Sequence, residues 1–173
     1  MEESTVIIEK AGSVNEECCP RFNPSTWENK NHAWKNKRFI TATVPTLFHM
    51  PIPLMIGNRV VKLMKKAQLV DALAKDKSDT LLLFYDPHPF KSEMYLSVEK
   101  EVPDIKNAFI SGNYFSKVYD GPYRFVPKFI KEMDAYLKSN MKKAVKYYVH
   151  YAYCPKCAQK EGHNYMVFFA EIE

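Results

Sequence analysis

The chain has 173 residues, of which 46% are hydrophobic, and this length and composition suit one domain with a substantial core, not a disordered protein. The formal net charge of +5 is too small to indicate a nucleic-acid-binding protein by itself. No apolar run approaches the roughly 20 residues that span a bilayer, and the acidic start lacks the apolar core of a secretory signal. We therefore expect a cytoplasmic protein without membrane contact, whose four cysteines remain thiols or bind a metal instead of forming structural disulfides.

Residues 1–36 are predicted to form an N-terminal arm that packs on the rest of the domain. The arm contains two prolines and two tryptophans near its end and shows little periodicity, which is typical of an extended segment. Trp27 and Trp34 are costly to leave in water, so they are expected to contact the domain. The arm either packs elsewhere on the body or covers a ligand groove as a lid.

From residue 37 onward, one pattern occurs twice: a strand, an amphipathic helix and two more strands. The first copy covers residues 37–104 and the second covers residues 105–173. The helices, expected within 53–75 and 122–140, each carry a single apolar stripe at steps of three and four residues. These repeats predict an α+β domain in which a curved antiparallel sheet carries both helices on one face and a ligand groove on the other.

The last strand of each copy alternates between two kinds of side chain. Met94 and Leu96 in the first copy, and Phe168 in the second, point toward the expected helix-covered core. The opposite face is aromatic and acidic, which suits a groove for an organic ligand. Drawing on these strands and on their neighbours, we predict that the groove is lined by Trp34, Glu93, Tyr95, Tyr119, Tyr147, Phe169 and Glu171.

The segment 109–140, FISGNYFSKVYDGPYRFVPKFIKEMDAYLKSN, resembles the GyrI-like (gyrase-inhibitor-like) small-molecule-binding domain family. Tyr119, Gly121, Pro122 and Tyr123 match the family's turn between a strand and its following helix. The likeness extends over residues 37–173, and the chain is more closely similar to a standalone branch often labelled "hydrolase", which shares the Cys-Cys-Pro start and the CPKC segment. The resemblance implies tandem repeats of SHS2 type and a domain that binds, or hydrolyses, a reactive small molecule.

The chain departs from this family at one site position. Many members have a Glu just before the Tyr of the strand that follows the second helix, whereas this chain has Lys146 or Tyr147 there. Glu93 or Glu171 could take its place from a neighbouring strand, and Glu171 is the candidate catalytic residue. We expect a binding protein for an aromatic, cationic or electrophilic compound, acting in detoxification, with binding without turnover favoured over hydrolysis.

A second functional class stays open, a non-catalytic interaction or regulatory module that uses its basic helix faces. Seven basic residues lie between Arg124 and Lys146 against two acidic ones, which is typical of a solvated helix. Because no DNA-binding helix-turn-helix, zinc-finger array or RNA-binding aromatic motif accompanies them, nucleic acid is disfavoured as a partner. The sequence does not specify an oligomeric state.

Four cysteines form the other group of reactive residues. Cys154 and Cys157 have the spacing that lets two thiolates bind one zinc ion, and Cys18 and Cys19 would complete a set of four. The alternatives are a redox-labile thiol pair and inert cysteines packed where the arm crosses the last hairpin. No cofactor is otherwise expected.

Overall fold

The computed structural model describes residues 18–51 and 53–173, so the first 17 residues of the predicted arm lie outside the described part. Its strands are β1 (Lys30–Leu47), β2 (Met50–Pro51), β3 (Leu82–His88), β4 (Lys91–Ser97), β5 (Asn107–Asp120), β6 (Ala144–Tyr151) and β7 (Tyr165–Ile172). Its α-helices are α1 (Pro53–Leu69), α2 (Val126–Ser139) and α3 (Pro155–Glu161), with short 3-10 turns at Pro24–Thr26, Lys77–Asp79 and Tyr123–Phe125.

The predicted order of strand, helix, strand and strand is confirmed in both repeats. The first repeat contains β1, α1, β3 and β4, and the second contains β5, α2, β6 and β7. The structure adds α3 between the last two strands, and it begins β1 at Lys30, inside the segment that the sequence assigned to the arm. None of the described helices is long and apolar enough to cross a membrane.

The sheet is closed, which corrects the prediction of an open sheet with a groove on its free face. All pairings are antiparallel, in the order β2-β1-β4-β3-β6-β7-β5, and β1 also pairs with β5. Six strands therefore form a barrel, and β2 extends from it along β1. The face that was predicted to hold an open groove is the interior of this barrel.

Closure depends on the length and the bend of β1. Its first half pairs with β5, from Lys30 opposite Ser116, and its second half pairs with β4, up to Pro45 opposite Lys91. A bulge interrupts the β1–β5 ladder after Trp34, and a bulge bends a strand and increases its twist. One strand can thus join both repeats.

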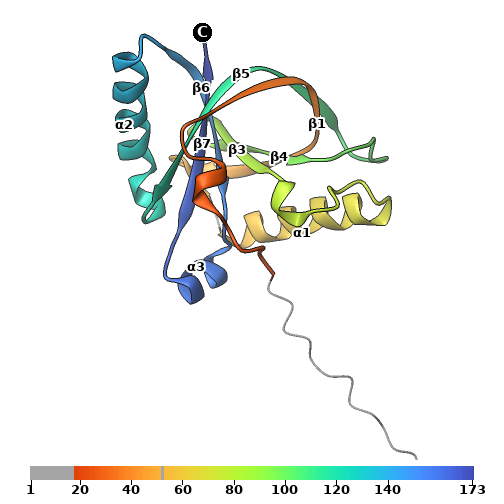
Figure 1. Ribbon diagram of the computed structural model, residues 1–173. Helices are drawn as coiled ribbons and strands as arrows, with labels where there is room; N and C mark the ends of the chain where they lie inside the picture. The colour runs from red at the N-terminus through yellow and green to blue at the C-terminus, as the bar shows by residue number, and fades with distance from the viewer. Residues whose placement is uncertain (1–17, 52) are drawn as a thin grey trace, which may run out of the picture.

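Each of the two long helices covers the outer face of its own repeat, as Figure 1 shows. Under α1, Leu63 packs with Met94 and Leu96 of β4. Under α2, Met133 packs with Phe168 of β7. These strand residues are the ones predicted to face the helices, so the alternation in β4 and β7 is confirmed.

The third cluster fills the barrel interior and is largely aromatic. Its fully or almost fully buried members come from β1, β3, β5, β6 and β7 and from the residue just before β3: Phe39, Leu81, Leu83, Ile110, Tyr114, Tyr148, Val167 and Phe169. Half-buried aromatic side chains from the arm and from β1, β3 and β4 pack against them: Phe22, Trp27, Trp34, Tyr85 and Tyr95. Among the described residues, these rings fill the centre of the barrel.

We expect Phe168→Ala to lower the free energy of unfolding by about 3–5 kcal/mol, because Phe168 is fully buried between the sheet and α2. Phe109→Ala is the matched control, since this ring is 54% exposed and its loss should cost less than about 1 kcal/mol. Urea denaturation of both variants measures the difference. Equal destabilisation by the two substitutions would contradict the assigned layer between β7 and α2.

Candidate functional site

The antiparallel register brings charged residues together at one end of the barrel. Glu93 lies opposite Tyr85, and Glu171 lies opposite both Lys146 and Tyr114. β4, β5 and β6 begin at this end, and β1, β3 and β7 run toward it. We call it the polar end, and we call the opposite end, where the N-terminal arm attaches, the arm end.

Glu93 is held by two donors at the polar end. The hydroxyl of Tyr95 donates to Glu93 Oε2 at 2.6 Å, and Lys91 Nζ lies 2.8 Å from Glu93 Oε1. The hydrogen bond from Lys91, followed by that from Tyr95, lowers the pKa of Glu93. Burial, followed by the hydrogen bond to Glu93, raises the pKa of Tyr95. At neutral pH the pair is therefore a carboxylate and a neutral phenol, and Glu93 is not a proton donor.

Lys146 places its ammonium group against two tyrosine rings. Its Nζ lies 4.6 Å from the ring centroid of Tyr85 and 4.6 Å from that of Tyr148, and the side chain is half-buried. The two rings are 5.7 Å apart. An ammonium group over aromatic faces is a favourable cation–π contact, so the chain's own lysine occupies this aromatic cage.

Glu171 forms the other acidic wall of the polar end. Burial, followed by the charge of Glu171, raises the pKa of Tyr114, and the same two causes come first for Tyr148. Gly112 gives these groups room: a Cβ there would lie 3.2 Å from the Tyr114 ring and 3.4 Å from Glu171 Oε1, and its φ of +147° favours glycine. The carboxylate of Glu171 and the hydroxyls of Tyr114 and Tyr148 thus share one environment.

A cavity of about 380 Å³ opens beside Glu93 and Tyr95. The size falls within the usual range for small-molecule sites, roughly 300–1,000 Å³. The wall carries more basic than acidic side chains, with Arg59, Lys62, Lys91 and Lys106 against Glu93 and Asp104. The cavity is therefore suited to an uncharged or negatively charged compound.

The structure brings five of the seven predicted groove residues to the barrel interior or its polar end. Tyr95 packs edge-on against Phe39, and Trp34 packs within the interior, 4.4 Å from Tyr114 and 5.4 Å from Phe169 between ring centroids. Glu93 and Glu171 stand at the polar end. Trp34 belongs to β1 and is part of the barrel wall, so it does not close the site as a lid.

Tyr119 and Tyr147 lie on the opposite face of the sheet, which corrects their predicted position. Tyr119 stacks on Phe129 of α2 at 4.7 Å, and the Tyr147 hydroxyl donates to Asp134 of α2 at 2.5 Å. Side chains alternate along a strand, so a displacement of one residue moves a side chain to the other face. In β5 and β6, aromatic residues occur on both faces, and alternation alone could not choose between them.

Four side chains of the site were not predicted from the sequence: Tyr85, Tyr114, Tyr148, and Lys146 in its contact with two rings. Tyr148 lies opposite Phe169, a residue already predicted to face the groove, so the pairing of β6 with β7 was the available signal. A bulge between Ala144 and Lys146 shifts the register at the start of β6 and conceals it.

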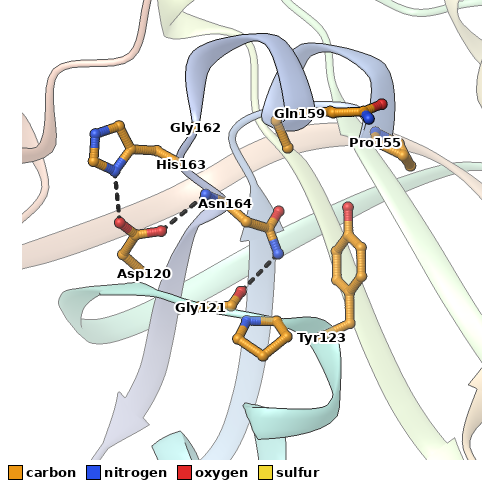
Figure 2. Close-up of a pocket in the computed structure, with 10 residues that line it drawn as sticks. Asp120, Gly121, Tyr123, Pro155, Gln159, Gly162, His163 and Asn164 are labelled. Carbon is orange, nitrogen blue, oxygen red and sulfur yellow. Dashed lines mark hydrogen bonds and ion pairs between the residues drawn. The ribbon is translucent and has the colours of Figure 1, made fainter.

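A second hollow, of about 450 Å³, lies at the arm end between α3 and the turn after β5. Figure 2 shows its hydrogen bonds: Asp120 Oδ2 contacts His163 Nδ1 at 2.7 Å, and Asp120 Oδ1 accepts from the Asn164 backbone at 2.8 Å. Asn164 Nδ2 in turn donates to the Gly121 carbonyl at 2.7 Å. These bonds tie the start of β7 to the end of β5. The residues described as lining the hollow include no serine, threonine or cysteine, and the one hydroxyl among them is the phenol of Tyr123.

The four cysteines meet beside this hollow. Cys18 Sγ lies 3.1 Å from Cys157 Sγ, 3.4 Å from Cys154 Sγ and 3.8 Å from Cys19 Sγ, and all four sulfur atoms lie within 4.8 Å of one another. Burial raises the pKa of Cys154. Hydrogen bonds from the Cys157 backbone and from the other thiols outweigh the effect of burial and lower the pKa of Cys154 to about 7. The cluster has the number and type of ligand atoms that zinc binds.

The described part of the arm packs at the arm end and in the interior, away from the polar end. The Phe22 ring lies 5.2 Å from that of Tyr165, and the Phe22 backbone donates to the Tyr153 hydroxyl at 3.1 Å. Trp27 lies edge-on to Phe169 at 5.7 Å, and its carbonyl accepts from Ser116 at 2.7 Å. The arm therefore covers the end of the barrel opposite the cavity beside Glu93.

Comparison with solved structures places the fold among known domains. The C-terminal domain of EcmrR matches 85% of this chain and 98% of its own length, with a TM-score of 0.61 and 9% identity. An uncharacterised conserved protein from Listeria innocua matches 84% of this chain and 92% of its own, with a TM-score of 0.63 and 9% identity. A hydrolase from Listeria innocua gives the same coverage and identity with a TM-score of 0.56. At these identities the likeness concerns the fold alone.

Among curated proteins, none matches the chain. One protein family does, over residues 10–172, which is almost the whole sequence. This match spans both repeats, the end of the arm that carries Cys18 and Cys19, and the segment that carries Cys154 and Cys157. The chain belongs to the family described as Bacterial hydrolase.

Proposed function

We propose that this protein binds a small planar compound at the polar end of its barrel, and that the compound presents a carbonyl or carboxylate oxygen to Lys146. The observation that carries the proposal is the position of Lys146, whose ammonium group lies over both Tyr85 and Tyr148. A lysine ammonium has three donors and no acceptor, so the group that meets it must be an acceptor. The half-buried rings of Tyr85 and Tyr95 would supply contact area for a flat ring.

This proposal narrows the ligand expected from the sequence. A cationic compound would have to displace Lys146 from its rings. Neutral electrophiles and anions do not face this obstacle. The family description supports hydrolysis as the reaction class to test.

If the bound compound is hydrolysed, Glu171 is the proposed base. Its carboxylate would accept a proton from water while the water oxygen bonds to the carbonyl carbon, and Lys146 would stabilise the developing negative charge on the carbonyl oxygen. The bond from this carbon to the leaving alcohol oxygen would then break, and Glu171 would return its proton to the leaving alkoxide. Glu93 is already engaged by Lys91 and Tyr95, so it is better suited to hold the wall of the cavity.

The first test compares three compounds with one ring system: 2-naphthoate, methyl 2-naphthoate and (2-naphthylmethyl)trimethylammonium. We expect the acid and the ester, and not the ammonium compound, to raise the melting temperature of the parent protein. Lys146→Met should weaken binding of 2-naphthoate by at least about tenfold, because it removes a charge-assisted contact, and it should allow the ammonium compound to bind. Thermal shift and calorimetry measure both effects.

Lys143→Met is the control for this exchange, since Lys143 is exposed on the segment just before β6. It should leave all three responses unchanged. Preference of the parent protein for the ammonium compound, unaltered by Lys146→Met, would contradict the proposed ligand class.

For hydrolysis, we expect Glu171→Gln to slow turnover of methyl 2-naphthoate by at least about 100-fold, because an amide cannot accept the proton from water. Binding of 2-naphthoate should change far less. Glu173→Gln is the control, because Glu173 is exposed beyond the end of β7. Chromatographic measurement of released acid follows the reaction, and an unchanged rate in Glu171→Gln removes Glu171 as the base.

We expect Tyr95→Phe to raise the pKa of Glu93 toward its ordinary value, because the variant loses the hydrogen bond to Oε2. A carboxyl group whose pKa is lowered by folding stabilises the protein above its ordinary pKa, and this contribution disappears as the pH falls through the lowered value. Tyr95→Phe should therefore reduce stability more at pH 7 than at pH 3. NMR titration and urea denaturation at both pH values measure this. Tyr85→Phe should leave the Glu93 titration unchanged; an equal response in both variants would refute the pairing.

A further inference from the structure

We infer that Cys18, Cys19, Cys154 and Cys157 bind one structural zinc ion that fastens the N-terminal arm to the arm end of the barrel. The inference is independent of the proposed ligand site, which lies at the other end. Two segments separated by more than 130 residues deliver two thiols each to one place. These four are also all the cysteines of the chain.

The sulfur atoms lie close to the separation that a shared metal ion would impose. Zinc–sulfur bonds of about 2.3 Å in tetrahedral geometry place neighbouring sulfur atoms about 3.8 Å apart. The three contacts of Cys18 range from 3.1 to 3.8 Å, and the remaining pairs lie within 4.8 Å. A disulfide would need one pair at about 2.05 Å, and all four cysteines are free.

Local backbone geometry supports thiolate ligands. The Cys154 backbone N–H donates to Cys19 Sγ at 3.3 Å, and the Cys157 backbone N–H donates to Cys154 Sγ at 3.5 Å. Such donors stabilise negative charge on sulfur and orient the ligands of a metal. The bend at Cys18 and Cys19 also turns both of these adjacent side chains to the same point, so their adjacency does not prevent joint binding.

His163 is not required as a ligand, although it follows Cys157 by only six residues. Its Nδ1 is engaged by Asp120, and its ring stacks on Tyr165 at 4.9 Å. The donor set is therefore four sulfur atoms, and such a set selects zinc or iron over magnesium and calcium. Zinc is the ion we assign, because a closed set of four thiolates with no open position is typical of a structural zinc site.

The ion would determine how firmly the arm closes the barrel. Directly after Cys18 and Cys19, the arm places Phe22 against Tyr153 and Tyr165, and then Trp27 against Phe169. On the other side of the cluster, Pro155 begins α3, which forms one wall of the second hollow. A zinc ion would bond both segments together, and its removal would release the arm from α3.

The decisive experiment measures metal content in the full chain purified without chelator. We expect about one zinc per chain by mass spectrometry of the metal. Replacement of zinc by cobalt should give the absorption bands of a four-thiolate tetrahedral site. Cys18→Ser and Cys157→Ser, one from each segment, should each lose most of the metal. His163→Ala and Lys156→Ala are controls on the same loop and should keep it.

Stability and proteolysis provide readouts that do not depend on activity. Chelation should lower the melting temperature by at least about 5 °C and should expose Arg21 and Lys30 of the arm to trypsin; added zinc should reverse both effects. Iron in place of zinc, a disulfide between two of these cysteines, or metal-free protein with four titratable thiols and an unchanged melting temperature would each overturn the assignment.

Discussion

The pairing of β1 with β5 is the constraint on which the rest of this structure depends. Without it the two repeats would form a curved sheet with a free aromatic face, and with it that face becomes the core of a six-stranded barrel. The interior of a barrel this small is filled by side chains. Both candidate sites accordingly lie at the ends, where the interior rings meet charged residues at one end and the arm at the other.

The two ends of the barrel differ in chemistry because each strand contributes the residues of its start to one end and the residues of its finish to the other. At the polar end, three separate strands supply Glu93, Lys146 and Glu171, each held by interior tyrosines. At the arm end, four cysteines and a network around Asp120 connect the last hairpin to its surroundings. A ligand at one end and a metal at the other could thus act without sharing a side chain.

The repeats, the helices and the faces of β4 and β7 could be predicted, because hydrophobic periodicity is a local property of sequence. Closure could not be, because it depends on residues 30–36, whose polar composition resembles a loop and whose strand geometry comes from pairing with β5. The same dependence on strand pairing explains why some residues of the candidate site could not be predicted. Tyr147 and Tyr148 are chemically identical neighbours, and only the bulge at the start of β6 decides which one enters the barrel. The cysteine group was predictable as a set, since spacing and count are visible without a fold.

The double role of β1 also has a consequence for folding kinetics. Lys30 pairs with Ser116, 86 positions away, whereas β3 and β4 are joined by a tight hairpin. Contacts this distant in sequence require a large loop to close before they contribute any stability, and such contacts slow folding. The ring should close last, after both repeats have formed their hairpins and docked their helices. Until then the aromatic face is exposed to water, so the nascent chain is most prone to aggregate in that interval.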